Sequence, residues 1–128
     1  MSKKKSFIIN RAKWLHGEVN ERSAENNSVL LRPEDGKMCC LGFFAKSVCQ
    51  LKNKDIESIG DLELEILKNS NLKNKFPKWF FEKYGLSADA WSLMEANDIF
   101  SLEDLVRENI IQTLFKKHNI DVKFVGKY

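Results

Sequence analysis

Three cysteines and two histidines are the side chains of this sequence best suited to bind a metal ion or to act as a nucleophile. Cys39 and Cys40 are adjacent, and neighbouring helical residues point ~100° apart, so the two thiols do not converge on one tetrahedral ion. Cys49 follows about two and a half helical turns later, and His16 and His118 lie elsewhere in the chain. We therefore expect packed thiols, with no metal site and no cofactor, because free cysteine is among the most buried residue types.

Cys39 also permits an enzymatic interpretation. The helix predicted for this segment places Cys39 near its N-terminus, where the helix dipole lowers the pKa of a thiol. A nucleophile of this kind needs a base, and the sequence places neither His16 nor His118 beside it. A cysteine-dependent enzyme that uses Cys39 is therefore an alternative, and no catalytic residue is assigned.

The segment 68–83 interleaves lysines with aromatic residues, which is typical of a surface that binds phosphates and stacks on bases. It contains no arginine, and the acidic segment 55–65 lies just upstream. The ordinary alternative is a solvated lysine face over an aromatic core. Nucleic-acid binding is thus a second alternative function, with candidate residues Lys73, Lys75, Lys78, Trp79 and Lys83.

A helix over 38–51 is expected to form the centre of the fold. At 100° per residue most of its apolar side chains fall on one broad arc, opposite a polar stripe that includes Lys46 and Gln50. Gly42 lies inside this arc, where glycine costs ~1 kcal/mol relative to alanine, so we expect it to leave room for a close-packed neighbour. Before the helix, Asp35 and Gly36 predict a turn.

Two residues of this helix do not fit the apolar arc. Cys39 and Phe43 lie four residues apart on the side of Lys46 and Gln50. Either a loop covers them, or they belong to a contact surface. We name Cys39, Phe43, Lys46 and Gln50 as candidate partner-binding residues.

The remaining patterns predict an α+β fold that is mostly helical. Residue types and alternation indicate strands at 7–9, 29–31 and 121–125. Caps and apolar spacing indicate further helices at 11–16, 62–66, 77–84, 88–97 and 101–118. Polar composition indicates loops at 18–28 and 69–75. The helix over 101–118 should be largely buried, because its apolar residues, including Leu105 and Val106, cover more than half of its circumference. We expect the first and last strands to form a small antiparallel sheet.

The composition indicates one folded domain. Of the 128 residues 43% are hydrophobic, so we predict a single globular domain over 1–128, with residues 1–6 as a basic, mobile tail. The net charge of +3 gives no overall electrostatic argument for nucleic acid or membrane. We find no membrane-spanning run and no signal peptide, and three cysteines without framework spacing fit a reducing compartment. We therefore expect a cytoplasmic protein without membrane contact.

Three stretches of the sequence resemble a group of small uncharacterised bacteriophage and prophage proteins. They are WLHGE at 14–18, the block LLRPEDGKMCCLGF at 30–43 and the ending NIDVKFV at 119–125. The resemblance implies a phage setting and therefore the cytoplasm of a host cell, and it implies no activity, catalytic residue or ligand. Phage genes of this size often encode proteins that bind and block or redirect a host component, including defence systems.

We therefore predict an intracellular protein that acts by binding a host macromolecule, with an inhibitor of a host process or defence system as the expected class. The expected partner is a host protein or complex, and the oligomeric state is left open. A nucleic-acid-binding protein that uses the segment 68–83 and an enzyme that uses Cys39 are the two alternatives.

Overall fold

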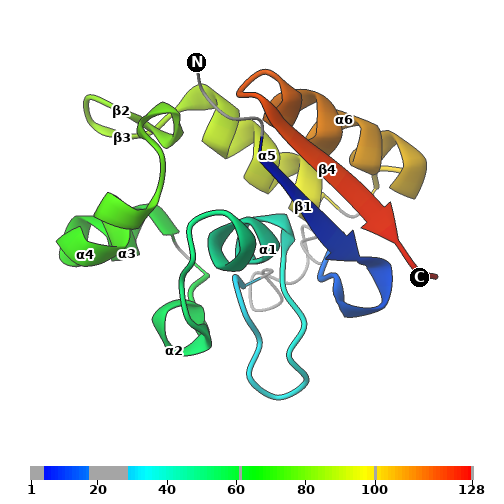
Figure 1. Ribbon diagram of the computed structural model, residues 1–128, viewed down its shortest axis with the longest axis horizontal. Helices are drawn as coiled ribbons and strands as arrows, with labels where there is room; N and C mark the ends of the chain where they lie inside the picture. The colour runs from blue at the N-terminus through cyan, green and yellow to red at the C-terminus, as the bar shows by residue number, and fades with distance from the viewer. Residues whose placement is uncertain (1–4, 18–28, 61, 100, 128) are drawn as a thin grey trace.

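The computed structural model describes residues 5–17, 29–60, 62–99 and 101–127 (Figure 1). In these ranges the fold is α+β with helices dominant, as predicted. The elements in chain order are β1 (Lys5–Asn10), the 3-10 helix η1 (Arg11–Lys13), α1 (Cys40–Ser47), α2 (Asn53–Ile56), α3 (Leu62–Lys68), α4 (Ser70–Lys75), the 3-10 helix η3 (Lys78–Phe80), β2 (Phe81–Glu82), β3 (Gly85–Leu86), α5 (Ala88–Asp98), α6 (Asp104–Lys116) and β4 (Ile120–Val125).

The first and last strands pair as predicted, but they run parallel. The pairs extend from Lys5 opposite Ile120 to Asn10 opposite Val125, so the predicted antiparallel arrangement is wrong. The turn at Asn119, with φ 63°, sends the chain from α6 into β4, and the Lys5 N–H donates to the Asn119 carbonyl at 3.2 Å. β4 therefore begins at the end of the sheet where β1 begins (Figure 1). Parallel neighbours require a crossover connection, and here the helices of the chain supply it.

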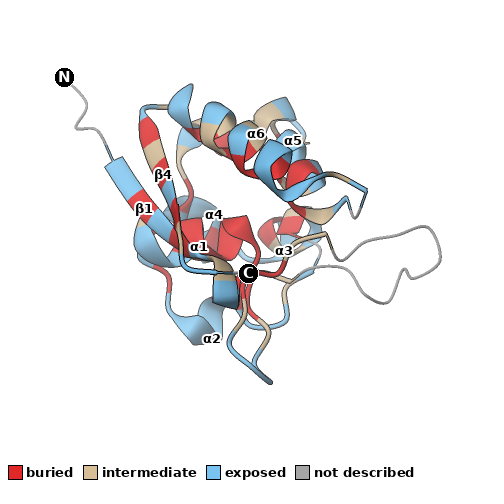
Figure 2. Ribbon diagram, turned by 90° about the vertical axis from the view of Figure 1, so that its right-hand side faces the viewer, coloured by how far each residue is buried: buried red, intermediate tan, exposed pale blue. Residues whose placement is uncertain are grey.

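The sheet is buried on one face. Along both strands side chains alternate between the interior and the solvent, and the buried ones are Phe7, Ile9, Ile120, Val122 and Phe124. Figure 2 shows α1, α5 and α6 on the same side of these strands. Because β1 begins at Lys5, the last two residues of the predicted tail belong to the strand, whereas residues 1–4 lie outside the described residues.

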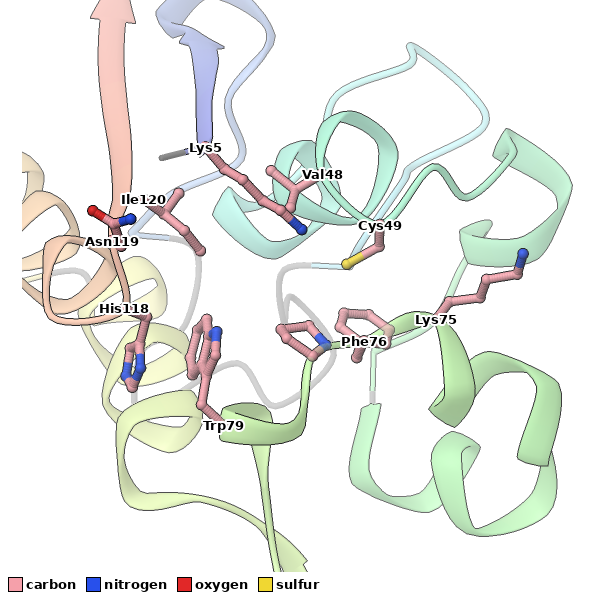
Figure 3. A pocket seen from close by; sticks show the side chains of 10 residues that line it. Lys5, Val48, Cys49, Lys75, Phe76, Trp79, His118, Asn119 and Ile120 are labelled. Carbon is pink, nitrogen blue, oxygen red and sulfur yellow. The ribbon is translucent and has the colours of Figure 1, made fainter. Parts of the chain in front are cut away.

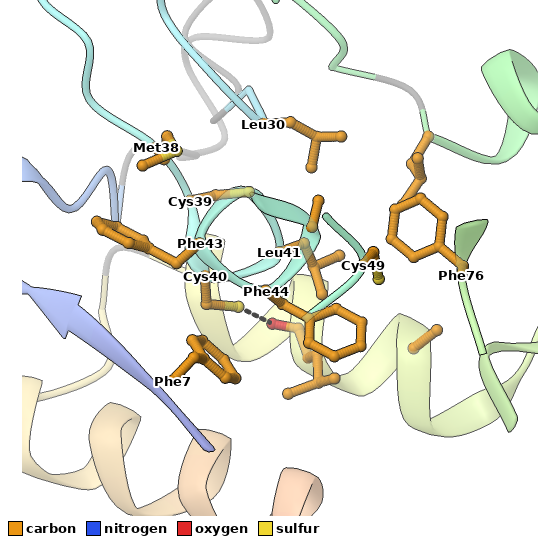
Figure 4. Packing of buried hydrophobic residues seen from close by; sticks show 14 of the residues in the cluster. Phe7, Leu30, Met38, Cys39, Cys40, Leu41, Phe43, Phe44, Cys49 and Phe76 are labelled. Carbon is orange, nitrogen blue, oxygen red and sulfur yellow. Dashed lines mark hydrogen bonds between the residues drawn. The ribbon is translucent and has the colours of Figure 1, made fainter. Parts of the chain in front are cut away.

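Helix α1 lies at the centre of the core, as predicted. Phe44 is fully buried, and its ring centroid lies within 6.3 Å of the ring centroids of Phe7, Phe76, Trp79, Phe80 and Phe115. Figure 4 shows Phe7 and Phe76 reaching the helix from opposite sides. The helix is shorter than the predicted 38–51, because it ends at Ser47 and Gln50 adopts a left-handed conformation with φ 59°.

Gly42 has the role that its position predicts. A Cβ atom built on Gly42 would overlap the carbonyl oxygen of Leu30 and lie 2.9 Å from the Cβ of Met38. The chain before α1 therefore packs directly on the helix backbone. The predicted turn is also present, since Gly36 has φ 73° and the Asp35 carboxylate accepts a hydrogen bond from the Lys37 N–H at 3.1 Å.

Other local predictions have mixed outcomes. The helix over 88–97 is confirmed as α5, and the Oγ of Ser87 accepts from the Ala90 N–H at 3.2 Å. The helix over 62–66 is confirmed within α3. The helix over 11–16 is reduced to η1, and at 29–31 Leu31 forms an isolated bridge rather than a strand. The predicted loop 18–28 lies outside the described residues.

Two predictions between α3 and α5 are wrong. Residues 69–75 are not a loop, because the Oδ1 of Asn69 accepts from the Leu72 N–H at 3.2 Å and thereby caps α4. Residues 77–84 are not one helix. A single turn, η3, is followed by a hairpin in which Phe81 pairs with Leu86, and Gly85, with φ 156°, starts the returning strand.

Helix α6 begins later and buries a narrower face than predicted. It starts at Asp104, Leu105 is 76% exposed, and Val106 is 44% exposed. The next two positions, Arg107 and Glu108, are buried instead. The reason is that the Arg107 guanidinium donates to carbonyls at the end of α5, which turns that side of α6 inward.

No helix in the described ranges combines the length and the apolar character that crossing a membrane requires.

Candidate functional site

The four candidate partner-binding residues do not form one surface. Cys39 is 7% exposed and Phe43 is 8% exposed, whereas Lys46 and Gln50 lie at the surface. Cys39 and Phe43 are therefore covered by the rest of the chain and do not belong to a contact surface. Figure 4 shows both side chains within the packing around α1.

The thiols lack the properties of an activated nucleophile. Burial raises the pKa of the Cys39 thiol to about 12, and the nearby charge of Asp98 acts in the same direction. Cys39 does precede the first turn of α1, as predicted, but desolvation outweighs any effect of the helix N-terminus. Burial also raises the pKa of Cys40 well above its ordinary value, and its thiol donates weakly to the Leu93 carbonyl (Figure 4).

Metal binding has no support in the described ranges. They contain no group of three or more histidine, cysteine, aspartate or glutamate side chains placed to hold an ion. The thiols are instead packed among apolar side chains of the core.

Lysines of the segment 68–83 line two different cavities. Lys75 and Trp79 line one cavity, and Lys73 and Lys83 line another. Lys78 is exposed and lines neither. The five candidate nucleic-acid-binding residues therefore do not follow one continuous track.

The larger of these two cavities, which we call the hairpin groove, lies between α3, α4 and the β2–β3 hairpin. Its volume is about 440 Å³, within the usual range of ligand sites. Figure 1 shows the hairpin on the same side of the molecule as α3 and α4. The apolar side chains of its lining are Ile66, Leu67, Phe81, Tyr84 and Leu86.

Large apolar side chains are exposed at this groove. Tyr84 is 84% exposed and Leu67 is 73% exposed, and Leu64 of the same helix is 47% exposed. Scattered exposed apolar residues are normal, but a group around a concavity marks a contact site. The sequence analysis missed this group, because a helix over 77–84 does not bring Tyr84 back toward α3.

Contacts between α3 and the hairpin shape the groove. The Glu63 carboxylate accepts a hydrogen bond from the Leu86 N–H at 3.1 Å. A Cβ atom on Gly85 would lie 2.5 Å from the Oε2 of Glu63, so the two walls meet closely. On the other side, the Nζ of Lys73 lies 5.5 Å from the ring centroid of Phe81, which anchors α4 to the hairpin.

The second cavity, which we call the lysine cavity, has a volume of about 280 Å³ (Figure 3). It lies where the start of β1, the end of α1, the segment 75–79 and the turn from α6 to β4 meet. Its polar lining includes Lys5, Lys75, His118 and Asn119, beside the indole of Trp79. The sequence analysis identified Lys75 and Trp79 but had no means of joining them to residues more than thirty positions away.

His118 forms a fixed wall of the lysine cavity. Its ring stacks on Trp79 with a centroid distance of 3.8 Å and an interplanar angle of 6°. Its Nε2 lies 2.7 Å from an Asp89 carboxylate oxygen, and the Nζ of Lys117 lies 2.9 Å from the other. Hydrogen bonds from Lys117 and then His118 lower the pKa of Asp89.

A catalytic pairing of His118 with Cys49, which lines the same cavity, is not supported. The Nε2 of His118 is already engaged by Asp89, and burial raises the pKa of the Cys49 thiol to about 12. No family model, curated protein or solved structure matches this chain. The site must therefore be interpreted from its own geometry.

Proposed function

We propose that this protein acts by binding a protein of a host cell through the hairpin groove. The observation that carries this proposal is the exposure of Leu67 and Tyr84 beside a concavity of about 440 Å³. An apolar concavity with exposed flanking side chains is the usual form of a site that receives apolar anchors from a partner. The resemblance to phage proteins supports a host protein as the partner, the host cytoplasm as the compartment, and inhibition of a host process as the effect.

The charged groups at the groove offer contacts for polar residues beside the apolar anchors of a partner. Lys73 and Lys83 both line the groove, and in the described part of the chain neither is ion-paired with a carboxylate. Of the two lining carboxylates, Glu63 is bound to the Leu86 N–H, and Glu82 is the other. The two ammonium groups and the two carboxylates give the lining no net charge, which complements a segment that carries both signs of charge.

The proposal is tested by comparing what matched variants capture from a host lysate. Leu67→Glu and Tyr84→Glu place a charge at the groove, whereas Leu105→Glu places the same charge at an equally exposed apolar residue on α6. We expect both groove variants to lose a protein that the unaltered chain and Leu105→Glu retain. Loss of a hot-spot contact costs roughly 2 kcal/mol or more, or about thirtyfold in affinity.

Two outcomes would contradict the proposal. In one, the captured proteins are the same for the groove variants and for Leu105→Glu. In the other, the unaltered chain forms a dimer in solution that Leu67→Glu dissociates, which would make a second copy the occupant of the groove.

A further inference from the structure

The lysine cavity has the charge of an anion site. Lys5 reaches it from β1 and Lys75 from the end of α4, and no aspartate or glutamate is among the described residues that line it. Figure 3 shows the amine of Lys5 beside Val48 and Cys49, with Lys75 beyond Phe76 on the far side. The Asp89 carboxylate behind His118 is bound by His118 and Lys117, so the Lys5 ammonium gives the cavity a positive potential. Lysine ammonium groups commonly serve as point charges for phosphate.

The cavity also offers an aromatic surface. His118 stacks on one face of Trp79, whereas Phe76 and Cys49 lie on the other side of the indole (Figure 3). Asp89 holds His118 in place at 2.7 Å, so this stack exists without a ligand. The indole of Trp79 lines the cavity in a fixed position and can stack on a flat ring, as aromatic side chains do with bases.

The size of the cavity limits the ligand. A volume of about 280 Å³ is slightly below the range for drug-sized ligands and fits a small molecule rather than a chain of nucleotides. The cavity shares no lining residue with the hairpin groove. Its interpretation therefore does not rest on the proposed function.

We propose that the lysine cavity binds a nucleoside monophosphate, with the phosphate attracted by Lys5 and the base stacked on Trp79. The phosphate supplies a negative charge opposite the Lys5 ammonium. The base supplies a flat ring for the indole that lines the cavity.

The full-length chain can be titrated with AMP, GMP, CMP and UMP while tryptophan fluorescence, to which Trp79 contributes, and isothermal heat are followed. We expect at least one of the four to saturate and to quench fluorescence, and the corresponding nucleoside to bind at least about tenfold more weakly because it lacks the charge. Lys5→Gln should weaken binding about tenfold. Lys75→Gln should weaken it less, because the Lys75 amine points away from the cavity (Figure 3). Lys78→Gln is the matched control, since Lys78 is exposed nearby but does not line the cavity.

Failure of all four nucleotides to saturate at about 10 mM, weaker than any ordinary metabolite site, would overturn the proposal. Inorganic phosphate that binds as tightly as the nucleotides would overturn the role of Trp79. A single-stranded oligonucleotide could instead bind more tightly than the mononucleotides and lose as much affinity with Lys78→Gln as with Lys5→Gln. That result would overturn the proposal in favour of a polynucleotide-binding surface outside the cavity. Thermal unfolding of each variant confirms that these exposed substitutions leave the fold intact.

Discussion

Asn97 is a buried polar residue that joins two of the sequence blocks on which the phage resemblance rests. Its Oδ1 accepts hydrogen bonds from the Trp14 indole at 2.8 Å and from the Cys40 N–H at 2.9 Å. Its Nδ2 donates to the Leu15 carbonyl at 2.9 Å. The block at 14–18 and the block that opens α1 therefore meet on one side chain, which explains both as parts of the scaffold.

Arg107 has a related structural role at the end of α5. It is 1% exposed, and its guanidinium donates to the carbonyls of Ala96 at 2.7 Å, Asn97 at 3.0 Å and Leu102 at 2.8 Å. These carbonyls include ones that a helix end leaves without an intrahelical partner. On this part of α6 an arginine therefore occupies a buried position where apolar side chains were expected.

The thiol chemistry gives a prediction at the scale of single residues. Because burial raises the pKa of Cys39 and Cys49 to about 12 and that of Cys40 well above its ordinary value, native protein at pH 8 should react with iodoacetamide far more slowly than unfolded protein. Alkylation followed by mass spectrometry, with and without urea, measures this difference. Rapid labelling of Cys39 in the folded protein would contradict the account and restore the enzymatic alternative.

Residue-scale inference from sequence was correct where a residue type has one strong physical meaning. Gly42 and Asp35 were assigned from local geometry alone, and the structure confirms both. The burial of Arg107 could not be predicted, because its partners are carbonyls that any residue can supply and only the packing of α5 on α6 selects them.

At the scale of elements, the contact between α1 and the chain before it depends on a missing side chain. Gly42→Ala should lower the free energy of unfolding by about 2 to 3 kcal/mol, because the new methyl group meets the backbone of Leu30, which outweighs a helix-propensity gain of ~1 kcal/mol. Urea denaturation measures the change. Gly60→Ala is the matched control, since its Cβ would meet only Val29 Cγ1 at 3.7 Å and should change stability by less than about 0.5 kcal/mol. Equal effects of the two substitutions would contradict the close packing.

The pairing of α5 with the end of α6 should depend on pH. The folded pKa of Asp89 is lowered by Lys117 and His118, so its stabilising effect is complete above its ordinary value of 3.8 and is lost as pH falls through the folded value. Asp89→Asn should cost about 1 kcal/mol at pH 7, because the contacts are partly exposed, and the difference from the unaltered protein should shrink below pH 4. Urea denaturation at pH 3 to 7 tests this, with the exposed Glu95→Gln as control. A difference at pH 3 as large as the difference at pH 7 would contradict this assignment.

Elements were predictable where the determinants are local. Strand β1 and helix α5 follow from residue type and a cap, whereas the direction of β4 depends on how the whole chain crosses over the sheet. The hairpin after η3 was missed, because Phe81 suits a strand only when Leu86 pairs with it. The hairpin groove could not be predicted without this hairpin, so the sequence predicted only part of the candidate site.

At the scale of the whole molecule, two concave sites divide the residues of one sequence segment and share no lining residue. Lys73 and Lys83 line the hairpin groove, and Lys75 lines the lysine cavity. The single basic surface expected from sequence is therefore divided, and each part takes its second wall from another part of the chain. For the groove that wall is α3, and for the cavity it is the start of β1 together with the turn from α6 to β4.

The central claim is that the hairpin groove holds a partner protein, and site-specific photocrosslinking in the host cell tests it most directly. A photoreactive amino acid is placed at Leu67, at Tyr84 or, as an equally exposed control, at Leu105. We predict that the first two positions crosslink the same host protein through a segment with apolar residues, and that the control does not. Crosslinks to that protein from Leu105 but from neither groove position would contradict the account.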